Sequence, residues 1–133
     1  MSIEKRNLIT RQMLRDEPET LFVFGDNMEQ RGFGGQAKEM RGEPNAVGIP
    51  TKWKPDMSPN AFFDDSDACF DAAKDRIRTA FIRLRSHQLA GGKIIWPEAG
   101  IGTGLANLEK SSLKIWALIE LCRIKLETGE RHE

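Results

Sequence analysis

The sequence predicts a single α/β domain of three layers, in which a mostly parallel sheet lies between helices. Three observations lead to this fold class. The chain of 133 residues has the size of one domain, so we assign residues 1–133 to one unit. Short apolar segments alternate with amphipathic ones, which is typical of a parallel sheet whose strands are joined by helices. The segment 20–25 is largely apolar, as expected of a strand covered on both faces.

The first part of the chain predicts two strands and two helical segments. Residues 3–16 predict a short strand and then a helical turn, which Pro18 ends because proline breaks a helix. The strand at 20–25 follows. After a loop, residues 34–41 predict a short helix that stops at Gly42.

The middle of the chain predicts a third strand and the longest irregular segment. The strand covers residues 45–50, and the loop covers residues 51–65. Long loops in compact domains tend to be functional or mobile. Two interpretations of the loop aromatics Trp53, Phe62 and Phe63 stay open: stacking on a nucleotide base, or capping of the core.

The second part of the chain predicts a helix over 67–86, a strand over 93–96 and a helix over 111–127 that ends at Gly129. Ser66 is the expected N-cap of the first of these helices. Apolar residues recur at three- and four-residue steps, so each helix buries one face. The expected core positions are Phe70, Ala73, Ile77, Phe81, Leu84, Ile115, Ile119, Cys122 and Leu126.

Composition excludes several classes of function. Lys and Arg together number 20, as do Asp and Glu, so the formal net charge is zero. This balance argues against broad nucleic-acid binding, which needs a basic face. No apolar run reaches the roughly 20 residues that span a membrane, and residues 1–6 are charged, so we expect a cytoplasmic protein. Cys69 and Cys122 are expected to be free, and no Cys/His cluster has zinc-ligand spacing, so we expect no metal or cofactor.

A first glycine-rich segment follows the strand at 20–25. Gly25 lets the chain turn, and Asp26 and Asn27 then stand at the strand end, where they are able to hydrogen-bond a base or a ribose. The spacing matches neither the dinucleotide fingerprint nor the Walker loop, so tight turns without a ligand are the alternative. The further ligand-binding candidates here are Arg31, Gly32, Gly34, Gly35 and Gln36.

A second glycine-rich segment follows the strand at 93–96, with three glycines at alternate positions. Backbone amides of residues 100–105 are expected to form a nest for an anion. The hydroxyl of Thr103 is expected to add a hydrogen bond to this anion, and the side chain of Ile101 is expected to lie over a ribose. The candidates in this segment are Gly100, Ile101, Gly102, Thr103 and Gly104.

Three polar residues complete the candidate site. Thr51 and Lys52 follow the third strand, and Lys52 is expected to pair with phosphate, with Asp26 or with solvent. Glu98 is a candidate general base, with a surface carboxylate as the alternative. Ligands of parallel α/β sheets bind outside the carboxyl ends of the strands, so we expect all these residues at one edge.

Four motifs carry a resemblance to a family of small, mostly uncharacterised bacterial and phage proteins. They are Phe-Gly-Asp-Asn at 24–27, Gly-Gly-Gln-Ala at 34–37, Gly-Ile-Pro-Thr-Lys at 48–52 and Gly-Ile-Gly-Thr-Gly-Leu-Ala at 100–106. The layout is also distantly similar to the macrodomain, a three-layer α/β/α module that binds ADP-ribose and sometimes hydrolyses ADP-ribosyl bonds. This resemblance implies that Asp26 or Asn27 contacts the nucleoside and that residues 100–104 hold the diphosphate.

Three functions therefore stay open. The first is binding of a diphosphate nucleotide, such as ADP-ribose or a related NAD-derived metabolite. An enzymatic form of this function would hydrolyse an ADP-ribosyl or phosphate ester bond, with Asp26, Asn27 and Glu98 as the catalytic residues. The second is a non-catalytic sensor or sponge for a nucleotide signal. The third is a protein or nucleic-acid interaction module in which the glycines only form turns.

Overall fold

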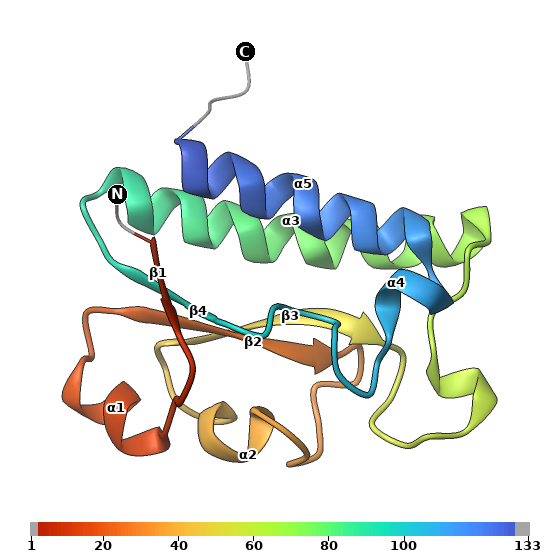
Figure 1. Cartoon of the computed structure of the whole chain (residues 1–133), viewed down its shortest axis with the longest axis horizontal. Coiled ribbons are helices and arrows are strands. Elements are labelled where there is room, and N and C mark those ends of the chain that lie inside the picture. Colours follow the sequence, from red (N-terminus) through yellow and green to blue (C-terminus); the bar gives the residue numbers. More distant parts are fainter. Residues whose placement is uncertain (1–2, 130–133) are drawn as a thin grey trace.

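The computed structural model describes residues 3–129, which form a three-layer α/β/α domain (Figure 1). The predicted fold class is confirmed, and every pair of neighbouring strands in the described part is parallel. The sheet order is β1-β4-β2-β3. The strands are β1 (Ile3–Arg6), β2 (Leu21–Asn27), β3 (Ala46–Lys52) and β4 (Ile94–Pro97).

Two long helices cover one face of the sheet and two short helices cover the other (Figure 1). The long ones, α3 and α5, lie side by side, and α1 and α2 lie across the sheet from them. The helices are α1 (Arg11–Asp16), α2 (Ala37–Met40), α3 (Asp67–Leu89), α4 (Leu108–Ser111) and α5 (Leu113–Thr128), with a 3-10 turn at Pro59–Ala61. No helix within residues 3–129 is both long enough and apolar enough to cross a membrane.

The alternation of side chains along β2 explains why this strand is apolar throughout. Leu21 and Val23 belong to the core cluster beneath α3 and α5. Phe22 and Phe24 belong to the cluster beneath α1 and α2. A strand at the centre of a parallel sheet needs apolar side chains on both of its faces, at odd and at even positions, because helices cover both faces of the sheet.

Helix α3 begins as predicted, because the hydroxyl of Ser66 accepts a hydrogen bond from the Cys69 amide at 3.1 Å. It runs to Leu89, three residues beyond the predicted end. The expected core position Phe70 is only half-buried, and Cys69 takes its place in the core. The other expected positions of this helix, Ala73, Ile77, Phe81 and Leu84, are buried.

Helix α5 begins two residues later than predicted, because residues 108–111 form the separate turn α4. Ser112 breaks the two apart with an extended backbone, and its hydroxyl accepts a bond from Ile115 N at 3.4 Å. Gly129 ends the helix as predicted, with a φ of 73°. Cys69 and Cys122 are both free, and burial raises the pKa of each thiol.

The other differences from the predicted elements are at boundaries. Helix α2 covers four residues rather than the predicted 34–41, and β3 extends two residues further, through Lys52. Strand β2 also extends two residues beyond its predicted end at Gly25, through Asn27, because Gly25 and Asp26 still pair with β3. Of the loop aromatics, Phe63 is fully buried and packs edge-on against Trp53 with ring centroids 4.9 Å apart. These two residues therefore cap the core.

Candidate functional site

Two glycine-containing loops leave the carboxyl ends of neighbouring strands. The first glycine loop (residues 28–36) joins β2 to α2, and the second glycine loop (residues 98–107) joins β4 to α4. They approach the same strand end: a Cβ placed on Gly25 would lie 3.9 Å from the amide nitrogen of Gly102. The first loop also lies close to the segment after β3, because a Cβ on Gly32 would lie 3.0 Å from the Cβ of Pro55.

Asp26 does not face the second glycine loop. It follows Phe22 and Phe24 on the side of the sheet covered by α1 and α2. Its carboxylate accepts hydrogen bonds from Arg41 Nη2 at 2.5 Å, from Arg41 Nη1 at 3.3 Å and from the Asn27 amide at 2.8 Å. It also lies over Gly48 of β3, where a Cβ would approach Asp26 Oδ2 to 2.8 Å. The glycine of the Gly-Ile-Pro-Thr-Lys motif thus makes room for this carboxylate.

Arg41 fastens the first glycine loop to the sheet. Besides its bonds to Asp26, it donates from Nε to the carbonyl of Gly32 at 2.7 Å and from Nη2 to the carbonyl of Arg31 at 3.2 Å. Its guanidinium lies 5.8 Å from the ring centroid of Phe24. The side chains of Asp26 and Arg41 are 7% and 15% exposed, so the pair is nearly buried. The sequence analysis missed Arg41, because an arginine at the end of a short helix carries no distinguishing local pattern.

Asn27 closes the turn inside the same loop. Its side-chain amide donates to the carbonyl of Arg31 at 2.9 Å, and the residue is buried. The side chain of Arg31 is exposed and pairs with Glu29 at 2.6 Å. Gly34 and Gly35 have open space around them, and the buried Oε1 of Gln36 accepts no hydrogen bond from the part of the chain that the structure describes.

Thr51 and Lys52 are both buried at the end of β3. The hydroxyl of Thr51 donates to the carbonyl of Asp26 at 3.1 Å. The ammonium of Lys52 donates to the carbonyl of Asp56 at 2.7 Å and lies 4.9 Å from the ring centroid of Phe62. Of the three alternatives for Lys52, the pair with Asp26 and the solvated side chain are therefore wrong. Arg41 occupies that carboxylate instead, because a guanidinium is able to bond both of its oxygens.

The second glycine loop leaves a run of its amides without an acceptor. The predicted nest of residues 100–105 does not include Gly100, because its amide donates to the carbonyl of Pro97 at 2.9 Å. Gly100 and Gly102 have positive φ of 92° and 78°, while Ile101 between them does not. The predicted placement of Ile101 over a ribose is wrong, because its side chain is buried in the core beneath α3 and α5. The loop is held through carbonyls and one hydroxyl: Leu108 N donates to Gly102 O at 2.8 Å, and Thr103 Oγ1 donates to Ala99 O at 2.7 Å. Within residues 3–129, the amides of residues 101–106 donate to no acceptor.

Glu98 stands at the beginning of this loop with an exposed side chain. Its amide donates to the carbonyl of Arg6 at 3.0 Å, which ties the loop to the end of β1. In the described part of the chain, no group of three or more His, Cys, Asp or Glu side chains is placed to hold a metal ion.

A polar hollow of about 340 Å³ lies beside Asp26, on the side of the first glycine loop. Charged residues of both signs line it, among them Arg41, Glu43 and Arg83. A hydrogen bond from Arg11, helped by Arg15, lowers the pKa of Glu43. Arg83 donates to the carbonyl of Pro44 at 2.9 Å. The charges of this hollow thus have protein partners.

The predicted site residues therefore form two groups. The carboxylate of Asp26, with Arg41 and the first glycine loop, lies on the α2 side of the sheet. Gly25, Thr51 and the second glycine loop gather at the carboxyl end of β2, where Gly25 and Thr51 share the side of the sheet that α3 and α5 cover.

The fold and these loops define a three-layer α/β domain with two glycine loops at the carboxyl edge of a parallel sheet. The chain belongs to a family described as a family of unknown function (DUF7831), whose model matches residues 4–121. No curated protein and no solved structure matches the chain.

Proposed function

We propose that this protein binds a diphosphate-containing nucleotide, ADP-ribose or a related NAD-derived metabolite, in a macrodomain-like manner at the second glycine loop. The observation that carries the proposal is the run of amides at 101–106 without an acceptor in the protein. Within this run Ile101 and Ala106 are buried and Gly102 is half-buried, whereas residues 103–105 are exposed. Buried backbone donors are normally paired, so this strand end is suited to an anion.

The geometry around these amides favours a phosphate. A positive φ at Gly100 and Gly102 with a negative φ at Ile101 is the alternation that turns successive amides toward one point. Gly25 presents no side chain beside the Gly102 amide, so a phosphate oxygen has access to it. The hydroxyl of Thr103 already donates a hydrogen bond to the carbonyl of Ala99, but its oxygen is still able to accept one from a ribose hydroxyl.

The state of the candidate catalytic residues favours binding over hydrolysis. The carboxylate of Asp26 is occupied by Arg41 and the Asn27 amide, and the side chain of Asn27 is occupied by Arg31. A general base needs a free carboxylate within reach of the water that it activates. Glu98 alone keeps a free carboxylate, and it is exposed. The sensor or sponge is thus the form of the proposal that these contacts support best.

The test is a calorimetric titration of the protein with ADP-ribose, ADP and inorganic phosphate, with two matched variants. Gly104→Glu adds a carboxylate to the second glycine loop, and Gly34→Glu adds the same group to the first. Both glycines have open space around them and neither has a positive φ, so both variants should fold. We expect Gly104→Glu to lower the affinity for ADP-ribose by about tenfold or more, since one unfavourable charge contact is worth at least 1.4 kcal/mol.

Gly34→Glu should leave the affinity within about threefold of the native value, because the first loop is held by Asp26 and Arg41. Absence of heat with all three ligands, or equal losses in the two variants, would contradict the proposal. Chromatography of the ligand released by denaturation separates the two forms: an intact nucleotide indicates a sensor or sponge, and a cleaved one indicates a hydrolase.

A further inference from the structure

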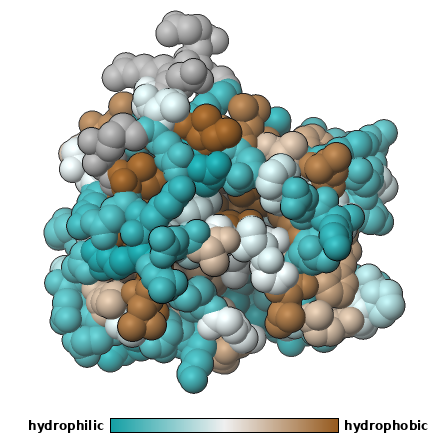
Figure 2. Space-filling model, viewed as in Figure 1, coloured by the Kyte–Doolittle hydropathy of each residue, from teal (hydrophilic) through white to brown (hydrophobic). Residues whose placement is uncertain are grey.

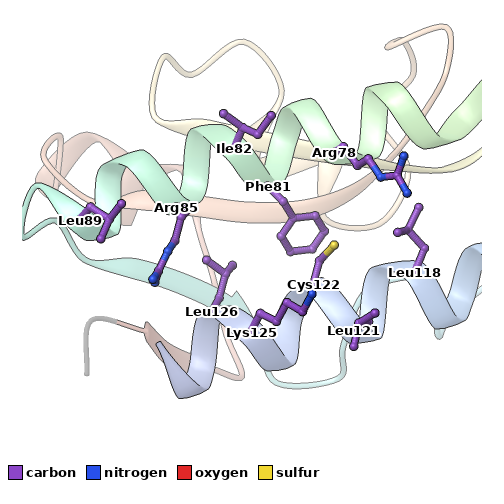
Figure 3. Close-up of a pocket in the computed structure, with 10 residues that line it drawn as sticks. All are labelled: Arg78, Phe81, Ile82, Arg85, Leu89, Leu118, Leu121, Cys122, Lys125 and Leu126. Atoms are coloured by element: carbon purple, nitrogen blue, oxygen red, sulfur yellow. The ribbon is translucent and has the colours of Figure 1, made fainter. Parts of the chain in front are cut away.

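A groove of about 570 Å³ runs between α3 and α5 (Figure 3), and none of the residues that line it belongs to either glycine loop. Its base is apolar: Phe81 and Leu126 are buried, and the side chains of Phe81 and Cys122 point toward one another across the groove (Figure 3). Each helix contributes residues at three- and four-residue steps, so a continuous stripe of α3 faces a stripe of α5.

Large apolar side chains stand exposed along both edges of this groove. Ile82 and Leu89 of α3 are 66% and 57% exposed, and Leu121 of α5 is 52% exposed. Figure 2 shows apolar side chains interrupting the hydrophilic surface over these two helices. A contiguous apolar surface with a charged border marks a protein interaction site more often than a random surface.

The charged residues that line the groove are all cations. They are Arg78, Arg85 and Lys125, and no acidic residue lines it. Arg78 makes no ion pair within residues 3–129, and Arg85 donates to Gln88 and to the carbonyl of Gly129. The groove therefore combines an apolar base with a positive border, which is complementary to an apolar surface with a negative border.

These observations select one occupant among three. A second copy in a two-fold contact would place two such cationic borders against each other, which is unfavourable. A small amphiphile in the groove would leave Ile82 and Leu121 exposed on the two edges. A helix, with a diameter of about 10 Å, would cover both edges at once. The lined stretch of α3, from Arg78 to Leu89, offers such a helix about three turns of contact.

We propose that the groove between α3 and α5 binds an acidic amphipathic helix of another protein. The apolar stripe of that helix packs on Phe81, Leu121 and Leu126, and its flanking carboxylates face Arg78 and Arg85. This is the helix-in-groove mode of recognition, in which apolar anchors recur at i, i+3, i+4 and i+7. The inference does not depend on nucleotide binding, because none of these residues lies in the glycine loops.

Two synthetic peptides of about 16 residues, long enough to form a helix, provide the probes. Both carry leucines at i, i+3, i+4 and i+7; one has glutamates on the flanks and the other has lysines at the same positions. Fluorescence anisotropy of the labelled peptides with the full chain measures binding. We expect the glutamate peptide to bind at least about tenfold more tightly than the lysine peptide.

Three variants test the site. Ile82→Glu should weaken the glutamate peptide by about tenfold or more, since it places a charge at the apolar contact. Arg78→Glu should weaken the glutamate peptide and strengthen the lysine peptide. Leu8→Glu is the matched control, because Leu8 is equally exposed, at 68%, but precedes α1 and lies outside the groove; it should change nothing.

Equal affinity for the two peptides, no binding of either, or equal effects of Ile82→Glu and Leu8→Glu would overturn the proposal. Sedimentation velocity of the native chain and of Ile82→Glu measures the oligomeric state, and so tests whether a second copy of the chain occupies the groove instead. A native dimer that Ile82→Glu converts to a monomer would also overturn the proposal, in favour of a second copy. We expect both proteins to sediment as monomers.

Discussion

The two glycine loops share composition and position, yet they differ in how the rest of the protein holds them. Each loop follows the carboxyl end of a strand and contains residues with positive φ. In the first glycine loop, the carbonyls of Arg31 and Gly32 accept hydrogen bonds from the side chains of Arg41 and Asn27. In the second glycine loop, the amides of residues 101–106 have no acceptor within residues 3–129. The amides of residues 32–36 in the first loop also have no acceptor within residues 3–129, so unused donors alone do not distinguish the loops. The second loop differs because two of its unpaired residues, Ile101 and Ala106, are buried, and because φ alternates in sign over residues 100–102.

The glycines themselves reflect the same difference. Gly32 adopts a φ of 93° against Pro55, so it serves a turn in close contact with a neighbouring segment. Gly102 adopts a φ of 78° against Leu108, and its amide faces the open position of Gly25. Gly32 shapes a loop whose carbonyl Arg41 holds, whereas Gly102 shapes a loop whose amide lies beside a position without a side chain.

The largest expected effect comes from releasing the first glycine loop. Arg41→Met should lower the free energy of unfolding by about 3 kcal/mol, because it leaves the nearly buried Asp26 carboxylate without its partner. Urea denaturation at neutral pH measures this. Hydrogen exchange should become faster for the amides of Asn27 and Arg31, which donate to the side chains of Asp26 and Asn27, and should stay unchanged for the amide of Leu108, which donates to Gly102.

The control for Arg41 is Arg31→Met, which removes an exposed ion pair with Glu29 and should cost less than about 0.5 kcal/mol. Adding Asp26→Asn to Arg41→Met should restore part of the stability, because the uncompensated charge is then absent. Equal effects of Arg41→Met and Arg31→Met would show that the first loop is not held by this pair.

A smaller effect is expected within the second glycine loop. Gly102→Ala should lower the free energy of unfolding by about 2 kcal/mol, because an alanine with positive φ is strained and its Cβ would meet Leu108 Cδ2 at 2.9 Å. Gly104→Ala, which has open space and no positive φ, should change it by less than about 0.5 kcal/mol. Thermal or urea unfolding of the two variants is the measurement, and similar values for both would contradict the described loop conformation.

The smallest effect concerns the side chain of Arg6 at the end of β1, the strand whose Arg6 carbonyl holds the second loop, and this effect depends on pH. Arg6 donates to Glu17 at 2.7 Å, and this bond lowers the pKa of the Glu17 carboxyl. A carboxyl whose pKa is lower in the folded state stabilises the fold at neutral pH and loses that contribution as the pH falls. Arg6→Met should therefore be less stable than the native chain by under about 1 kcal/mol at pH 7.

The difference between the two proteins should shrink as the pH falls from about 5 toward 3, because Glu17 becomes protonated in both. Glu4, whose pKa Arg6 and Lys93 also lower, adds to the same trend. Urea unfolding at several pH values measures it. A difference that stays constant over this range would mean that Arg6 acts through packing alone.

Local patterns were sufficient for the elements with strong signals. Ser66 and Gly129 were predicted as the ends of α3 and α5, because a cap depends on a few neighbouring residues. The apolar segment of β2 predicted a central strand, because a continuous apolar run is also a local feature of the sequence. The bounds of the short helix α2 were misplaced and the break at Ser112 was not predicted, since contacts from distant parts of the chain decide where such weak elements begin and end.

The candidate site was predictable as a set of strand ends but not as a set of contacts. The sequence places Asp26 next to Asn27 and after Gly25, and this order alone suggests a shared site. Strand alternation turns Asp26 and Gly25 to opposite faces of the sheet, and α2 then brings Arg41 to the carboxylate. The alternation along a strand shows from the sequence which residues share a face of the sheet. It does not show which side chain of another helix or strand each of them contacts.

The sequence by itself determined the alternation of strands and helices, the principal caps and the two glycine loops, because these depend on residues close together in the chain. Only the tertiary structure decided that one loop is fastened and the other open. It also decided that α3 and α5 lie side by side with an apolar groove between them. These outcomes depend on distances between side chains far apart in sequence, such as Asp26 and Arg41 or Phe81 and Cys122, which no local pattern encodes.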